Sequence, residues 1–382
     1  MTLTNADMAE LVALRRELHR LPELSGQEGQ TAQRIAAEMG RLGPDTLITG
    51  LGGHGVAAVW QGADAGPTVM FRCELDALPI QETGDPPYRS AEPGRGHLCG
   101  HDGHMAIMAG LARRLSRQPP RRGRAVLLFQ PAEETGAGAA AVIADEKFAA
   151  IAPDFAFALH NMPGLPLGHV GLAEGPVNCA SRGLAVTLTG HPAHASDPES
   201  GCSPMPALAD LMPALTALGQ GTLDDPDFAL VTVTHARMGE PAFGIAPGEA
   251  TLYATLRTLT DDTMTALVGK ALDLVTKAAH AHGLAVEHRF EDVFLHCEND
   301  PRAVAVLRRA LDRLGMAHST AGQPWRASED FGRFGQHAAA AMFLLGSGRD
   351  HAALHHSDYD FPDDLIAPAV RIFEATARDL LG

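Results

Sequence analysis

The fold class is decided by one short stretch, Thr68-Val69-Met70-Phe71-Arg72-Cys73-Glu74-Leu75-Asp76. It begins with an apolar segment, residues 68–71, that directly follows Gly66-Pro67, and it carries two acids toward its end. Short apolar runs bounded by glycine or proline are typical of buried strands. The same pattern recurs over residues 56–59, 125–129 and 155–159, and apolar residues at helical spacing follow over residues 105–115 and 137–143. This alternation of strand and helix predicts an α/β fold with a mostly parallel sheet.

The pattern changes near residue 180, where longer strands begin to carry threonine at alternate positions. Such alternation is typical of a sheet with one solvated face. Strands are expected over residues 184–188, 229–234, 250–258 and 284–290, and helices over residues 205–218 and 263–281. Their β-α-β-β-α-β order is the ferredoxin-like arrangement. We therefore expect an α/β domain in two parts, residues 1–178 and 294–382, interrupted by an α+β domain of residues 179–293.

The composition excludes several classes of protein. The 382 residues carry 30 Lys and Arg against 46 Asp and Glu, and this formal net charge of -16 disfavours binding to nucleic acid or to an anionic membrane surface. No apolar run approaches the roughly 18 residues that span a membrane, and the N-terminus lacks the pattern of a signal peptide. The 5 cysteines are scattered and do not suggest a disulfide framework. We therefore expect a cytoplasmic protein.

Potential metal ligands gather in the stretch Cys99-Gly100-His101-Asp102-Gly103-His104. Cysteine and histidine suit zinc and similar metals. Four further segments place acids or histidines after expected strands, namely Glu74 and Asp76, Glu133 and Glu134, His160, and His355-His356. Ligands of open α/β sheets bind at the carboxyl ends of the strands. The pattern predicts a metal site built from five separated segments.

The adjacent acids Glu133 and Glu134 indicate what such a site does. One carboxylate can coordinate metal while its neighbour takes a proton from metal-bound water. A structural zinc site closes with four protein ligands and needs no spare base. The sequence therefore predicts metal-assisted hydrolysis, with a Cys99 nucleophile aided by a histidine as an alternative. We expect Asp102 to cap the following helix and His19 to be structural.

These residues resemble a known family. The chain is similar to the M20 family of metallopeptidases and amidohydrolases, in the branch of hippurate hydrolases, N-acyl-amino-acid amidohydrolases and auxin-conjugate hydrolases. The matching stretches run almost from end to end: residues 19–25, 72–79 and 99–104, Phe129-Gln130-Pro131-Ala132-Glu133-Glu134, Ala158-Leu159-His160, His194-Ala195-Ser196, Ser328-Glu329-Asp330-Phe331, and Leu354-His355 leading to Tyr359-Asp360-Phe361.

The resemblance implies a three-layer α/β/α catalytic domain of the zinc-peptidase kind, with the inserted ferredoxin-like domain as a lid and dimerisation domain. It also implies a homodimer joined through that domain. The expected cofactors are two divalent metal ions, with zinc as the first candidate and manganese, cobalt or nickel as alternatives. The expected substrate is an N-acylated amino acid or a related small-molecule amide.

By motif position, the resemblance also implies the roles of individual residues. The metal ligands would be Cys99, His101, Glu134, His160 and His355, with the Cys99 thiolate bridging the two ions. Glu133 would be the general base, and Asp76 would orient a ligand such as His101. His194 of the lid would polarise the scissile carbonyl or hold the oxyanion, commonly in the partner subunit's site.

Four positions depart from the family pattern, and three of them lie in the lid. Outside the lid, Glu74 replaces the usual aspartate two residues before Asp76. Glu199 stands after Pro198 where a histidine is usual, Ser203 replaces the aspartate of an Asp-Pro pair, and Gly244 replaces the asparagine of Asn-Val-Ile-Pro. The metal chemistry is therefore expected to be intact and the lid's substrate contacts altered, which leaves the acyl group, the amine and the stereochemistry open. Alternatives to a deacylase are a metallo-dipeptidase or carboxypeptidase, and a non-catalytic metal-binding relative.

Overall fold

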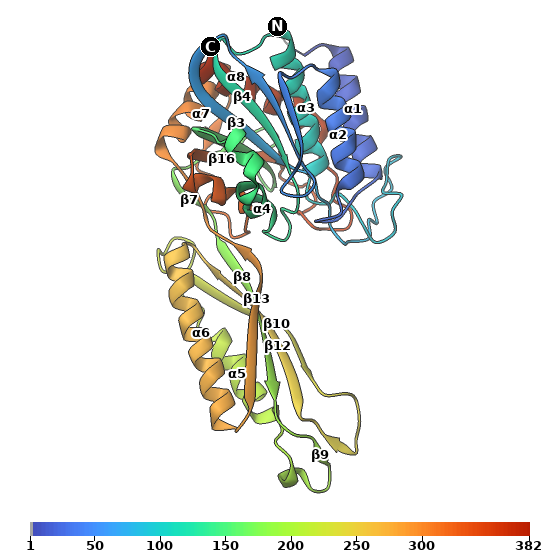
Figure 1. Ribbon diagram of the computed structural model, residues 1–382, viewed down its shortest axis with the longest axis vertical. Helices are drawn as coiled ribbons and strands as arrows, with labels where there is room; N and C mark the ends of the chain where they lie inside the picture. Colours follow the sequence, from blue (N-terminus) through green and yellow to red (C-terminus); the bar gives the residue numbers. More distant parts are fainter. Residues whose placement is uncertain (1–2) are drawn as a thin grey trace. The chain divides into compact units, whose positions relative to one another are not determined.

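The computed structural model describes residues 3–382, which fold into two units (Figure 1). The first unit takes in the chain up to Val177, together with Cys297–Trp325 and Glu329–Gly382. The second unit consists of Asn178–His296 and Arg326–Ser328. An α/β unit interrupted by an α+β unit confirms the predicted fold class.

An eight-stranded sheet forms the centre of the first unit, in the order β1-β2-β4-β3-β5-β16-β6-β15. The strands are β1 (Thr46–Leu51), β2 (Gly55–Gln61), β3 (Asp64–Glu74), β4 (Arg122–Gln130), β5 (Phe155–Pro163), β6 (Val170–Gly171), β15 (His318–Ser319) and β16 (Ala339–Gly348). The four central strands β4, β3, β5 and β16 pair in parallel, as predicted. The pairs β1–β2, β2–β4 and β6–β16 are antiparallel, so the sheet is mixed toward its edges.

Helices cover both faces of this sheet and make it the middle of three layers. Along β3, Val69 and Phe71 pack into one core, while Met70 points into the other. The first core holds α1 (Asn5–Arg20), α2 (Gly29–Arg41), α3 (His101–Arg117), α7 (Pro301–Leu314) and α8 (Ile366–Leu381). The opposite core holds α4 (Gly138–Ala144) and the 3-10 helices η1 (Glu146–Ala150) and η3 (Asp330–Gln336).

The second unit has the predicted ferredoxin-like topology. Its antiparallel sheet has the order β10-β12-β8-β13. These strands are β8 (Ala180–Thr189), β10 (Ala229–Met238), β12 (Glu249–Thr258) and β13 (Ala285–Phe294), and the helices are α5 (Met205–Thr216) and α6 (Asp261–Ala281). Apolar residues of the two helices pack with those of the strands in one core, which leaves the threonine-bearing face free of helices.

Several short elements lie outside the predictions. In the second unit, β9 (Ala193–His194) pairs with β11 (Ile245–Ala246), and η2 (Pro198–Ser200) follows. Elsewhere, β7 (Gly175–Asn178) pairs with β14 (Cys297–Asn299), and η4 (Asp363–Leu365) precedes α8. Strand β1 also escaped prediction, because it lies at the edge of its sheet with most residues exposed and so lacks an apolar run. Among residues 3–382, every helix is too short or too polar to cross a membrane.

Candidate metal centre

Cys99 and His101 are brought together by the turn at Gly100, just where α3 begins. Gly100 has φ 97°, a left-handed conformation that favours glycine. A Cβ on Gly100 would also lie 2.6 Å from Oδ1 of Asn161. Conformation and close packing therefore both require glycine between the two expected ligands.

The other expected ligands come from three further segments. Glu134 lies in the loop after β4, and His355 lies in the segment before η4, where its N–H donates to the carbonyl of Leu98 at 2.8 Å. The placement of His160 beyond its strand was wrong. Strand β5 continues to Pro163, because Asn161 and Met162 still pair with β16, so His160 lies inside the strand.

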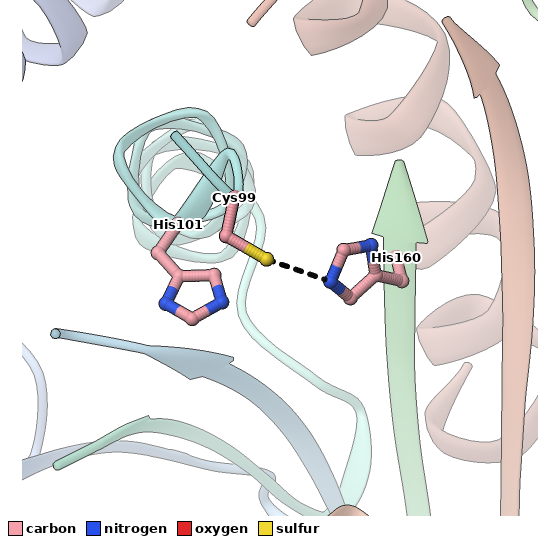
Figure 2. Close-up of side chains that lie close together, drawn as sticks. All are labelled: Cys99, His101 and His160. Atoms are coloured by element: carbon pink, nitrogen blue, oxygen red, sulfur yellow. Dashed lines mark hydrogen bonds between the residues drawn. The ribbon is translucent and has the colours of Figure 1, made fainter. Parts of the chain in front are cut away.

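The donor atoms of the five expected ligands converge in the first unit. Figure 2 shows Cys99, His101 and His160, with Sγ of Cys99 lying 3.5 Å from Nε2 of His160. Oxygens of Glu134 lie 3.8 Å from Nε2 of His101 and 3.6 Å from Nε2 of His355. Two groups of mutually close donors result, Cys99 with His101 and His160, and Cys99 with Glu134 and His355. Cys99 belongs to both.

The hydrogen bonds of two histidines direct a lone pair at this cluster. Nδ1 of His101 donates to the main-chain carbonyl of Asp76 at 2.9 Å, and Nδ1 of His160 donates to that of Asn161 at 2.8 Å. Because a carbonyl can only accept, each Nε2 is left unprotonated in the neutral ring, as a metal ligand requires. Nε2 of His101 and Oε1 of Glu134 are buried without a hydrogen-bond partner in residues 3–382. The donor set therefore fits divalent ions.

Asp76 contacts His101 through its main-chain carbonyl, and it contacts Glu134 through its carboxylate. Its carboxylate oxygen Oδ1 lies 3.6 Å from Nδ1 of His101, which is beyond a hydrogen bond, so the main-chain carbonyl orients that ring. Its other oxygen, Oδ2, accepts from the N–H of Glu134 at 3.0 Å and from Oγ of Ser25 at 2.7 Å. Asp76 thus links the two segments that carry His101 and Glu134.

Two neighbours of the cluster are tied up in other contacts. Nδ1 of His104 contacts Glu74 at 2.6 Å and Nε2 contacts Oδ1 of Asn161 at 2.6 Å, which leaves neither nitrogen for an ion. The prediction that Asp102 caps α3 was wrong, because Gly100 is the cap residue and Asp102 lies in the first turn. The buried Asp102 pairs instead with Arg15 at 3.3 Å and with His19 at 2.9 Å.

His19 is structural, as predicted. Its ring is fully buried between Asp102 and Glu82, at 2.9 and 3.2 Å. Burial alone would lower the pKa of His19, but hydrogen bonds with the two carboxylates outweigh it and raise that pKa to about 9. Protonated His19 therefore forms an ion pair with Asp102 in the first turn of α3.

Glu133 is buried beside two acids to which the sequence assigned no role. One carboxylate oxygen each of Glu133, Glu329 and Asp330 lie within 4.8 Å of one another. Burial and the charges of Glu329, Glu134 and Asp330 hold the pKa of Glu133 well above its usual range, and Arg72 opposes them. Glu329 and Asp330 were visible in the sequence as a motif, but their partner Arg72 is 258 residues from Asp330, beyond any local pattern.

Trp325 also borders the centre, and no feature of the sequence indicated it. Its ring meets that of His160 edge-on, with ring centroids 5.1 Å apart. The indole is partly exposed, so it gives the candidate centre an apolar border beside His160.

The expected lid residues belong to the second unit. His194 is exposed on β9, opposite Ile245 of β11, and its Nδ1 lies 2.7 Å from Oγ of Ser196. Gly244 accepts a hydrogen bond from the N–H of Ala195, and a Cβ at Gly244 would meet nothing within 4 Å. Glu199, in η2, and Ser203 also lie outside the core of this unit. The backbone here would accept the family's usual residues without strain.

Comparison with known proteins covers nearly the whole chain. The profile of Peptidase family M20/M25/M40 matches residues 70–379. N-acetyl-L-cysteine deacetylase of Bacillus subtilis (strain 168) is 31% identical over 382 residues, covering 97% of this chain and 88% of that protein. N-acetyldiaminopimelate deacetylase of Anoxybacillus flavithermus is 28% identical, covering 94% and 95%. The crystal structure of Bacillus subtilis YXEP protein, a dinuclear metal binding peptidase from the M20 family, aligns with TM-score 0.83 and 26% identity over 99% of both chains.

Replacement of Cys99 tests the shared position of its sulfur. Because Sγ lies in both donor groups, Cys99→Ala is expected to lower the zinc bound per chain after chelation and reloading, measured by elemental analysis. Cys73→Ala is the matched control, since Cys73 is equally buried but lies outside the donor groups among residues 3–382. An unchanged ratio of metal to protein in Cys99→Ala would remove this residue from the centre.

Proposed function

The chain belongs to peptidase family M20/M25/M40, and we propose that it is a metal-dependent amide hydrolase that removes the acyl group from an N-acylated amino acid or a related amine. One observation carries this proposal: five candidate metal ligands lie close together, and a buried carboxylate, Glu133, lies beside them. The deacetylase relatives cover the chain almost from end to end, which supports the same class of substrate.

Two divalent ions would share Cys99, one with His101 and His160 and the other with Glu134 and His355. Zinc is the first candidate, because thiolate and imidazole suit it, and manganese, cobalt or nickel are alternatives. When bound, such ions polarise an amide carbonyl and acidify water. Burial and nearby acids raise the pKa of the Cys99 thiol well above its usual range, so the thiolate needs a cation beside it. This disfavours a Cys99 nucleophile working without metal.

Glu133 would move the proton of the reaction. Its carboxylate takes a proton from the attacking water, whose oxygen forms the new bond to the acyl carbon. The same proton then passes from Glu133 to the nitrogen of the leaving amine as the C–N bond breaks. The raised pKa of Glu133 suits this double role, because a carboxylate of ordinary acidity holds a proton too weakly to be an effective relay near neutral pH.

His194 would stabilise the negative charge that develops on the carbonyl oxygen. Its imidazole is exposed and is steadied by Ser196 on the short β9–β11 ribbon, so it is available to a site elsewhere in the assembly. We propose that it acts in the partner subunit of a homodimer joined through the second unit. Glu199, Ser203 and Gly244 lie in the same unit, and we assign to them a choice of acyl group and amine that differs from the relatives.

A cytoplasmic location is supported by the cysteines. All 5 are free, and Cys73, Cys99, Cys179 and Cys297 are buried. Free thiols are typical of proteins in reducing compartments.

Glu133→Gln is expected to keep its metal and to lose activity. The amide retains the size of the side chain but takes up no proton, so kcat should fall by roughly 10²–10⁴-fold. Turnover would be followed on N-acetyl and N-benzoyl amino acids and on dipeptides, with zinc, manganese, cobalt or nickel added to chelated enzyme. Glu146→Gln, at an exposed position in the same unit, is the control. Full activity in Glu133→Gln would exclude it as the base, and hydrolysis of dipeptides alone would make the protein a dipeptidase.

Glu329→Gln is expected to shift the pH profile. Glu133 works as a base in its ionised form, so kcat/KM is present above its pKa and is lost as the pH falls through it. Removing the Glu329 charge lowers the pKa of Glu133 and frees Arg72 to stabilise the carboxylate. The acidic limb of the kcat/KM profile should therefore move to lower pH. A limb that stays in place, or moves to higher pH, would show that Glu329 does not influence the base.

Mixed dimers test the placement of His194. The variants Glu133→Gln and His194→Ala, each inactive alone, would be co-expressed with different affinity tags and isolated as heterodimers. One of the two sites in such a dimer would then combine an intact Glu133 with an intact His194 from the partner, so about half of the wild-type activity should return. Heterodimers that stay inactive would show that His194 serves its own subunit's site, and an active His194→Ala homodimer would show that it serves none.

A further inference from the structure

The loop between β4 and α4 carries both Glu133 and Glu134, and buried carboxylates from outside hold it. We call residues 131–137 the acidic loop. Oε1 of Glu28 accepts from the N–H of Ala132 at 2.8 Å, and Oδ2 of Asp76 accepts from the N–H of Glu134 at 3.0 Å. Oδ2 of Asp330 accepts from the N–H of Ala139 just beyond the loop, at 2.8 Å. The main chain on either side of Glu133 is thus fixed by Glu28 and Asp76.

Of these three carboxylates, Glu28 is the one whose side chain has no metal-ligand candidate or cation among its hydrogen-bond partners in residues 3–382. It is fully buried, and its hydrogen-bond partners are the main-chain N–H groups of Gly26 and Ala132. Its second oxygen, Oε2, has no partner in residues 3–382. Burial raises the pKa of Glu28, which shows that the surroundings disfavour its charge. A buried acid of this kind is costly for folding, so its contact with the acidic loop needs a separate explanation.

Ala132 supplies that explanation. Its φ is 51°, a left-handed conformation that side-chain-bearing residues rarely adopt, and it directly precedes Glu133. Left to itself, the backbone would relax at this position, and the direction of the next two side chains would change with it. The hydrogen bond from Ala132 to Glu28 opposes that relaxation, because it fixes the peptide N–H of the strained residue.

We propose that Glu28 is a positioning residue for Glu133 and Glu134. By accepting the N–H of Ala132, its carboxylate keeps residue 132 in the left-handed conformation and so directs the base and its neighbouring metal ligand toward the centre. The inference rests on the proposed function, in which these two acids do the chemistry. The segment that contains Glu28 also supports the main chain on the other side of Glu133. The hydroxyl of Ser25 donates to Oδ2 of Asp76, and the same oxygen accepts from the N–H of Glu134.

The test separates the acceptor atom from the charge. Glu28→Gln retains a carbonyl oxygen that can accept from Ala132, while Glu28→Met keeps the volume and offers no acceptor. We expect Glu28→Met to lower kcat about tenfold to hundredfold with KM little changed, and Glu28→Gln to stay within about threefold of the natural protein. Adding Ala132→Gly to Glu28→Met should restore kcat about fivefold, because glycine adopts the left-handed conformation without strain.

Glu23 provides a matched control from the same segment. Its Oε2 accepts from the N–H of Thr31 in α2 at 2.7 Å, and so it braces α2 instead of the acidic loop. Glu23→Met should lower the unfolding midpoint and leave kcat unchanged. If Glu28 were merely structural, Glu28→Met would behave in the same way.

A readout independent of turnover is the visible spectrum of protein loaded with cobalt(II). The ligand field reports where Glu134 sits, so Glu28→Met should change the spectrum and weaken cobalt binding, and the added Ala132→Gly should move both back. Should Glu28→Met not fold, Glu28→Asp replaces it, because the shorter side chain does not bring a carboxylate oxygen within hydrogen-bond distance of the N–H of Ala132. An acceptor-lacking variant with normal kcat and an unchanged spectrum would overturn the inference. An inactive natural protein with these spectral changes would overturn the proposed function alone.

Discussion

The buried guanidinium of Arg72 is the interaction on which the metal end of the sheet depends. Arg72 lies in the central strand β3, and its side chain is fully buried. It pairs with Glu74, with Glu329 at 2.9 Å and with Asp330 at 2.6 Å. Without it, Glu74, Glu329 and Asp330 would lose their guanidinium partner, and breaking a buried ion pair costs about 3–5 kcal/mol. The flat fork of arginine also matters, because its Nε reaches Gln130 of β4 at 2.9 Å while both terminal nitrogens hold acids.

From Arg72, polar contacts extend beneath the whole centre. Glu74 hydrogen-bonds with His104 of α3, and His104 hydrogen-bonds with Asn161 of β5. Asn161 in turn donates to the hydroxyl of Tyr359, near the C-terminus. Helix α3, strand β5 and the segment before η4 therefore each supply both a candidate metal ligand and a residue of this buried chain. Such support holds the donor atoms of the candidate ligands in place, and the carbonyl acceptors of His101 and His160 favour the tautomer whose Nε2 is unprotonated.

Local sequence patterns were enough to predict most secondary structure and the candidate ligands of the centre. Strand and helix patterns located β2, β3, β4 and β5 of the first unit and both helices of the second unit. Acids and histidines near strand ends located the candidate centre. His160 was found for a partly wrong reason, since its strand continues past it. The supporting residues were missed because their partners are remote: Glu28 and Ala132 are 104 residues apart, and neither periodicity nor a motif encodes a contact of that separation. A cap at Asp102 was a sound local expectation that Arg15 and His19 override through tertiary contacts.

The two units are constrained to different degrees, and this difference bears on how specificity changes. Around Glu133, the buried charges share partners, so the effects of substitutions there are coupled. At Gly244 a side chain would meet open space, and Glu199 is exposed, so changes at these positions leave the second unit's core intact. The departures from the family pattern at Glu199, Ser203 and Gly244 fall where the structure tolerates them. The departure at Glu74 lies among the buried acids, where Arg72 and His104 pair with it. Substitutions at these exposed positions of the inserted unit are therefore less constrained by packing than substitutions around Glu133.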